Sequence, residues 1–134
     1  MQKKNCLHII DPQNDFCNPG DANGNGLGSL FVPNADKDME TLAQWVSDNK
    51  SKIDGISVTL DSHQVNDIAH PSFWCDKDGN QVPPFTPISA QDVKDGKWIP
   101  SFAPKRALDY LESLEANGQF GHFVWPEHCL IGTE

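Results

Sequence analysis

The sequence predicts an α/β fold built around a parallel sheet. Three apolar stretches, at residues 5–10, 55–60 and 121–124, have the length and composition of strands. A helical pattern at 34–49 separates the first two, and strand, helix and strand in this order predict a parallel pair with a right-handed crossover. Each stretch runs directly into polar residues. Because ligands bind at the carboxyl ends of strands in open α/β sheets, a functional site is expected at one edge of the sheet.

Length and composition limit the possible classes of protein. The 134 residues fit one domain with a modest core. The formal net charge of −9 argues against nucleic acid as a partner, because phosphates need clustered Lys and Arg side chains. We find no signal segment and no long apolar span, so we expect no membrane partner and a cytoplasmic location. The four cysteines show no Cys-x-x-Cys spacing, which favours thiols over a disulfide framework.

Two helices are expected. The first, at 34–49, begins at Asn34, a residue type that caps helix N-termini, and its apolar residues recur at helical spacing along one face. The second, at 104–117, begins with Pro104, which suits the first turn of a helix, and Gly118 fits the position after its end.

The segment 74–100 shows neither a helical nor a strand period and contains four prolines. We interpret it as an ordered excursion from the domain, of the kind that forms a lid or a pocket wall. The alternative of a flexible linker is disfavoured, because large aromatic residues in or beside the segment need burial. These residues are Phe73, Trp74, Phe85, Trp98 and Phe102.

A group of metal-ligating residue types follows the second and third apolar stretches. Asp61 and His63 share one face of an extended segment, because alternate residues of a strand do so. His70 lies seven residues further on, and His128 follows the third stretch. Several imidazoles with one carboxylate can bind Zn²⁺, Mn²⁺ or Fe²⁺. The alternative is that Asp61 caps a turn and that the histidines are ordinary loop or surface residues.

Polar and aromatic residues also follow the first and third stretches. Asp11 stands where a general base could act, although Asp residues in such a run also stabilise turns. Phe16 and Trp125 could together clamp a flat ring by stacking, or each could belong to the core. Cys129 follows His128, but a Cys-His pair is disfavoured, because a histidine that binds a metal cannot serve as the base.

Taken together, these motifs resemble a known family. The order and spacing of Ile9-Ile10-Asp11-Pro-Gln-Asn-Asp15-Phe16, of Asp61-Ser-His63 with His70, and of Trp125-Pro-Glu-His128-Cys129 are similar to those of the nicotinamidases among the isochorismatase-like cysteine hydrolases. The resemblance implies a Rossmann-like three-layer α/β/α fold around a parallel sheet. Residues 1–134 would be the N-terminal part of this single domain and would lack its C-terminal strands.

The resemblance also implies a chemistry: hydrolysis of nicotinamide to nicotinate and ammonia through a cysteine thioester. Asp11 would be the catalytic base, and Phe16 and Trp125 would pack on the substrate ring. A divalent metal, zinc first and manganese or iron as alternatives, would fix the pyridine nitrogen. Its ligands would be Asp61, His63, His70 and His128. The family's catalytic lysine and nucleophilic cysteine follow the Trp-Pro-x-His-Cys element, and no lysine or cysteine of this chain stands in those positions.

Two other functions stay open at this point. The chain could bind a metal or a ligand without catalysis, or it could belong to another cysteine hydrolase of the same superfamily. The expected partners are a small-molecule amide substrate and either a second copy of the chain or a complementing C-terminal segment.

Overall fold

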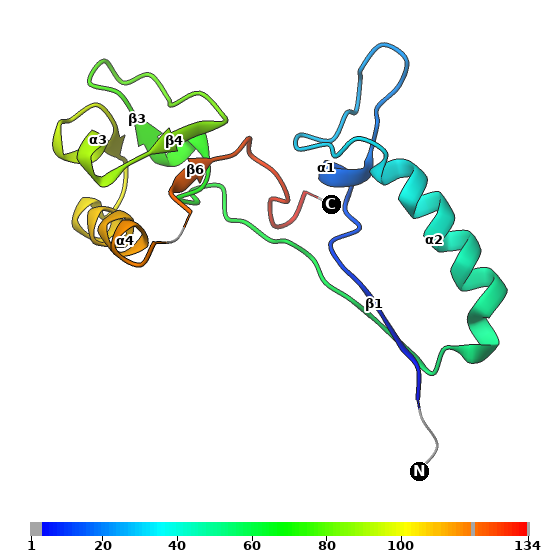
Figure 1. The fold of residues 1–134 in the computed structure, drawn as a ribbon. Helices are drawn as coiled ribbons and strands as arrows, with labels where there is room; N and C mark the ends of the chain where they lie inside the picture. Colours follow the sequence, from blue (N-terminus) through cyan, green and yellow to red (C-terminus); the bar gives the residue numbers. More distant parts are fainter. Residues whose placement is uncertain (1–3, 119, 134) are drawn as a thin grey trace. The chain divides into compact units, whose positions relative to one another are not determined.

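The computed structural model describes residues 4–118 and 120–133 and divides the chain into two compact units (Figure 1). Unit 1 consists of Met1–Ser62 and His128–Glu134, and unit 2 consists of His63–Glu127. Both units mix helices with short strands, so the expected α/β class is confirmed at this coarse level. The single domain expected from the chain length stays a prediction.

Unit 1 contains the predicted strand–helix–strand element. Strands β1 (Cys6–Ile9) and β2 (Gly55–Val58) pair in parallel, with Cys6 opposite Gly55 and Ile9 opposite Val58. They are connected through the short helix α1 (Asn14–Cys17), the long helix α2 (Ala35–Asn49) and the single turn η1 (Lys50–Lys52). Helix α2 begins where expected, but Asn34 makes no side-chain capping bond, because its φ of +73° places it in the left-handed region.

The sheet of unit 1 leaves apolar side chains uncovered. Ile56 and Val58 of β2 are each 51% exposed, and α2 contains no buried residue. Parallel sheets are normally covered on both faces. Among the described residues this sheet has only the two strands β1 and β2, and the side chains of β2 are not buried on it.

Unit 2 is built from two small antiparallel sheets and two helices. One sheet pairs β3 (Trp74–Cys75) with β5 (Ile99–Pro100), and the other pairs β4 (Thr86–Ile88) with β6 (His122–Val124). The turn η2 (Pro71–Phe73) precedes β3, and the helices are α3 (Ala90–Lys94) and α4 (Pro104–Ala116). The segment 74–100 is thus ordered and supplies three of the four strands of unit 2.

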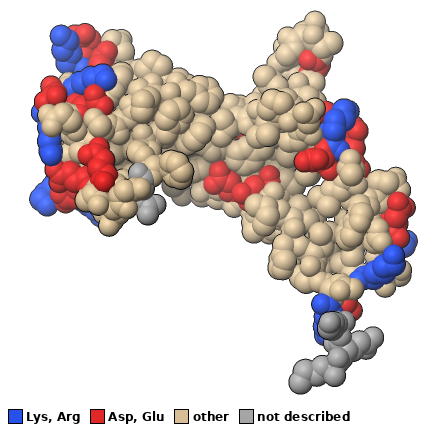
Figure 2. Space-filling view, viewed as in Figure 1, with Lys and Arg blue, Asp and Glu red and all other residues tan. Residues whose placement is uncertain are grey.

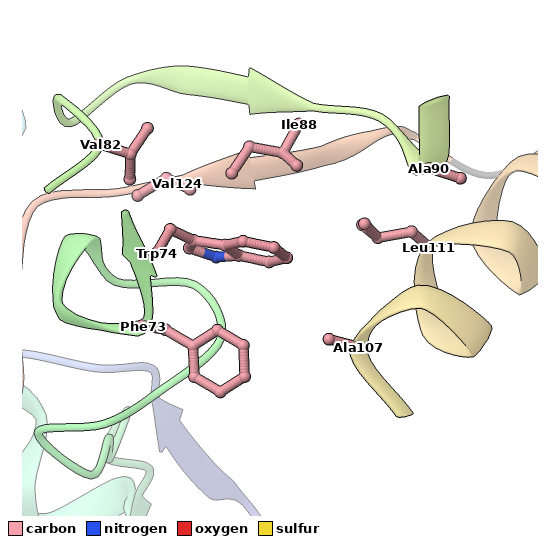
Figure 3. Packing of buried hydrophobic residues seen from close by; sticks show 8 residues of the cluster. All are labelled: Phe73, Trp74, Val82, Ile88, Ala90, Ala107, Leu111 and Val124. Carbon is pink, nitrogen blue, oxygen red and sulfur yellow. The ribbon is translucent and has the colours of Figure 1, made fainter. Parts of the chain in front are cut away.

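The hydrophobic core of the described chain lies in unit 2 (Figure 3). Trp74 is 1% exposed, and its ring lies among side chains from α4, β4 and β6. Its indole nitrogen Nε1 donates a hydrogen bond to the carbonyl oxygen of Ile68 at 2.7 Å. The ring is therefore both buried and satisfied, as a buried tryptophan requires. The core consists of Phe73, Trp74, Val82, Ile88, Ala90, Ala107, Leu111 and Val124.

Burial of the excursion's aromatic residues is confirmed for Phe73 and Trp74 and wrong for two others. Phe85 is 55% exposed and Phe102 is 64% exposed. Phe85 has a φ of +64°, and its N–H donates to the carbonyl oxygen of Val124, so the residue turns at the end of a strand pair. Its ring packs against the rings of Phe123 and Trp125 instead of entering the core.

The third predicted strand forms, but its partner differs from the expectation. Residues 121–124 were expected to join the parallel sheet, whereas β6 pairs antiparallel with β4, with Ile88 opposite His122. This pairing buries Ile88 and Val124 in the core of unit 2, which accounts for the preference. The three-layer Rossmann-like arrangement is therefore not confirmed.

Helix α3 begins with a capping box that should make stability depend on pH. The hydroxyl of Ser89 accepts from the N–H of Asp92, and the Asp92 carboxylate accepts from the N–H of Ser89 and from the Lys97 ammonium group. Lys97 and then Ser89 lower the pKa of Asp92 from 3.8 to about 2.

We expect the Asp92 carboxylate to contribute fully to stability above pH 3.8 and to lose that contribution as the pH falls toward about 2, because the folded state holds the lower pKa. Asp92→Asn should therefore flatten the fall in unfolding free energy across this window. Urea titrations at several pH values measure it, with Asp78→Asn in an exposed turn as the control. An unchanged pH profile in Asp92→Asn would contradict the assignment.

Two surface and helix properties can be described for this chain. On the face in Figure 2, most Lys and Arg side chains lie beside Asp and Glu side chains, and no continuous basic area is seen. No helix in the described part of the chain combines the length and the apolar character that a membrane crossing needs. No disulfide joins the four cysteines, all of which lie in the described part.

Candidate metal and substrate site

Unit 1 places one predicted metal ligand beside another. Nε2 of His128 lies 3.2 Å from Oδ2 of Asp61, and the His128 side chain is only 5% exposed. Gln13 holds the backbone of Asp61 from both sides: Asp61 N–H donates to Gln13 Oε1 at 2.7 Å, and Gln13 Nε2 donates to the Asp61 carbonyl oxygen at 2.9 Å. Because Gln13 is itself buried, these bonds fix the position of Asp61.

Asp15 anchors the loop that carries His128. Its carboxylate accepts hydrogen bonds from the N–H of Cys129 and from the N–H and hydroxyl of Ser29. Burial raises the pKa of Asp15, but the N–H groups of Cys129 and Ser29 outweigh it and hold the pKa below its ordinary value. Cys129 has a φ of +49°, so this anchor also stabilises an unusual backbone conformation next to His128.

The other two predicted residues of unit 1 follow β1 along the chain, Asp11 at the strand end and Phe16 in α1. Asp11 has a φ of +47°, and its carboxylate accepts a hydrogen bond from the Thr59 hydroxyl at 2.7 Å, so it lies at the carboxyl edge of the β1–β2 pair. Phe16 packs its ring against His128 in an edge-on arrangement, with 5.6 Å between the ring centroids. Phe16 is therefore a neighbour of a predicted metal ligand.

Unit 2 brings together two further predicted ligands. The rings of His63 and His70 lie with their centroids 4.8 Å apart, and His70 is fully buried. Nδ1 of His63 lies 3.0 Å from Oδ2 of Asp67. Burial raises the pKa of Asp67, but the Ala69 N–H and the His63 ring outweigh it and lower the pKa. In metal sites, a carboxylate on one ring nitrogen orients the other nitrogen toward the ion.

Trp125 lies in unit 2 as part of an aromatic cluster. Its N–H donates to the Ala69 carbonyl oxygen at 2.8 Å, and its ring is 39% exposed. The Phe123 ring lies 4.8 Å away and the Phe85 ring 6.1 Å away, centroid to centroid. An exposed aromatic surface of this kind can stack on a flat ligand ring.

The sequence-based alternative for the histidines is partly excluded. His70 and His128 are 0% and 5% exposed, so neither is an ordinary surface residue. The imidazoles of His63, His70 and His128 could supply ligands to a metal ion. Imidazole nitrogens with a carboxylate oxygen form the donor set that suits zinc, so the residues present fit such an ion.

Two residues that contribute to the site were not found from the sequence. The sequence around Gln13 indicates a turn. Its role in holding the Asp61 backbone follows only from its hydrogen bonds to that residue, 48 positions away. Asp67 lies four residues after His63, but that spacing alone does not distinguish an orienting carboxylate from a turn residue. No family model, curated protein or solved structure matches the chain.

Asp67 provides a test of whether a carboxylate orients one of the histidine ligands. We expect Asp67→Asn to weaken zinc binding about 10- to 100-fold, because the amide holds the His63 ring less firmly and makes it a weaker ligand. Competition titration against a zinc-binding dye measures the affinity, with Asp78→Asn as the matched control. Equal affinity in Asp67→Asn and the unaltered protein would show that Asp67 does not orient a ligand.

Proposed function

We propose that this chain forms the metal- and substrate-binding part of a nicotinamidase-type amidase, with a divalent metal, zinc first, held by Asp61, His63 and His128. The fully buried His70 would be a further ligand. The observation that carries the proposal is that a histidine lies beside a carboxylate in each unit, at 3.2 Å for Asp61–His128 and at 3.0 Å for His63–Asp67.

Each remaining residue has a role that its surroundings support. The metal, when bound, would supply a positive charge that fixes the ring nitrogen of the substrate. Asp11 would take the proton of the attacking thiol, and its hydrogen bond from Thr59 holds the carboxylate at the strand end. Phe16 and Trp125 would contact the faces of the pyridine ring.

The reaction needs a thiol, and two of the described cysteines have surroundings that disfavour this role. Cys129 is buried, and its backbone N–H donates a hydrogen bond to the Asp15 carboxylate. Burial raises the pKa of the Cys17 thiol, which disfavours a thiolate there. In the complete reaction the thiol would add to the carboxamide carbon, ammonia would leave, and water would cleave the thioester to nicotinate. The nucleophile would come from a segment outside residues 1–134.

The same observation on the cysteines favours a second candidate function. A chain that binds a metal through its histidines without hydrolysing an amide needs none of the cysteines. Metal binding is therefore common to both candidates, and only amide hydrolysis separates them.

Ammonia release from nicotinamide by the full-length gene product tests the proposal. We expect turnover in the unaltered protein, a fall of more than about 100-fold in Asp11→Asn because the general base is lost, and no change in Asp48→Asn on the exposed side of α2. Zinc content should be equal in all three. Absence of ammonia from nicotinamide and from a panel of small amides, with zinc bound, would leave the non-catalytic function.

A further inference from the structure

Unit 2 contains a cavity of about 810 Å³ between α4 and β6. Tyr110 and Leu114 line it from α4, and His122 and Phe123 line it from β6. The volume is in the range of pockets that hold small molecules, and such pockets combine apolar walls with a few polar groups. The walls here are largely aromatic and aliphatic.

His122 is the buried polar group of this cavity. It is 6% exposed, and its Nε2 lies 2.9 Å from the carbonyl oxygen of Ile68. Because a carbonyl oxygen can only accept, Nε2 carries the proton, and Nδ1 is then the acceptor of the neutral ring. Burial lowers the pKa of His122, which favours this neutral form at pH 7. Within residues 4–118 and 120–133, no group donates a hydrogen bond to Nδ1.

The rings around His122 favour a flat ligand. Tyr110 meets the His122 ring at 81° with 5.7 Å between centroids, and Phe123 and Trp125 lie 4.8 Å apart. Aromatic side chains in such arrangements offer both faces and edges to an entering ring.

We propose that the cavity between α4 and β6 binds a planar aromatic molecule that donates one N–H or O–H hydrogen bond to Nδ1 of His122. A ligand that donates to this nitrogen would supply a hydrogen bond that no described group of the protein provides. The site lies wholly within unit 2 and needs no metal. It shares Trp125 with the amidase proposal but is defined by His122 and α4, which that proposal does not use.

Indole and 1-methylindole form a matched pair of probes, because they differ by the one N–H that would reach Nδ1. We expect indole to bind with 1:1 stoichiometry and 1-methylindole to bind about tenfold more weakly, the factor for one net hydrogen bond. Chemical-shift titration of the full chain in the presence of EDTA measures both affinities and excludes any contribution of a metal. Equal affinities, or no saturable binding of indole, would overturn the proposal.

A cavity-filling substitution locates the binding site. Leu114→Trp should reduce indole affinity at least tenfold by filling the cavity, whereas Ala116→Trp, on an exposed position of the same helix, should leave it unchanged. Undiminished binding in Leu114→Trp would place indole elsewhere. If Leu114→Trp does not fold, the comparison of indole with 1-methylindole on the unaltered chain still tests the proposal. Indole binding is measured without metal. A failure of indole binding would therefore leave the amidase proposal standing, and absence of amidase activity would leave the cavity proposal standing.

Discussion

Replacing His63 and His128 together by alanine should abolish tight zinc binding. The unaltered chain is expected to retain one zinc ion per molecule after desalting, and the double variant should bind it more than about 1,000-fold more weakly, because two imidazole ligands are lost. The two residues come from different units, and each lies beside a carboxylate in its own unit. Elemental analysis and calorimetric titration measure content and affinity.

The control for this experiment is His8→Ala. His8 lies in β1, where Nδ1 of its ring contacts the hydroxyl oxygen of Ser57, and it is not among the proposed ligands. We expect its zinc content to equal that of the unaltered chain. Equal zinc content in the double variant and the unaltered chain would remove the metal site from both candidate functions.

The second large effect concerns the core of unit 2. Leu111→Ala should lower the free energy of unfolding by about 2–5 kcal/mol, because Leu111 is 1% exposed and its removal leaves a cavity beside Trp74 (Figure 3). Urea denaturation followed by tryptophan fluorescence measures the change.

Glu112→Ala, one position further along α4, is the matched control. Glu112 forms an ion pair with Lys94 in which both side chains are about half exposed, and such pairs contribute at most about 1 kcal/mol. A loss for Leu111→Ala no larger than that for Glu112→Ala would contradict the packing of α4 on this core.

Local sequence patterns predicted the elements that local interactions define. The helix expected at 34–49 is α2 at Ala35–Asn49, and the one expected at 104–117 is α4 at Pro104–Ala116. Periodic apolar residues and the positions of Pro104 and Gly118 were sufficient, because helices are stabilised within their own segment. The β1–β2 pair joins residues 49 positions apart, as between His8 and Ser57, and it could still be predicted because the order strand, helix, strand favours a parallel crossover.

The pairing of β6 could not be predicted in this way. Its partner β4 is three residues long and contains Pro87, which has no N–H for a ladder, so the segment reads as a loop. The pairing depends on burying Ile88 and Val124 with Trp74, which are contacts between distant parts of the chain. Such contacts leave no periodic signal in the sequence.

The candidate site also combines residues that local patterns could predict with residues that they could not. Asp11, Asp61 and His128 could be proposed because chemistry-bearing residues follow apolar stretches, and the structure does bring Asp61 to His128. The residues that hold them in place depend on tertiary hydrogen bonds. Gln13 acts on Asp61 across 48 positions, and Asp15 acts on Cys129 across 114 positions.

X-ray absorption spectroscopy of the zinc-loaded chain tests whether histidines and Asp61 hold one divalent metal. We expect only nitrogen and oxygen neighbours at about 2.0–2.1 Å, with the multiple scattering of at least two imidazole rings. A sulfur neighbour at about 2.3 Å, or the loss of the imidazole signal, would show that cysteines or solvent bind the ion instead of the proposed ligands.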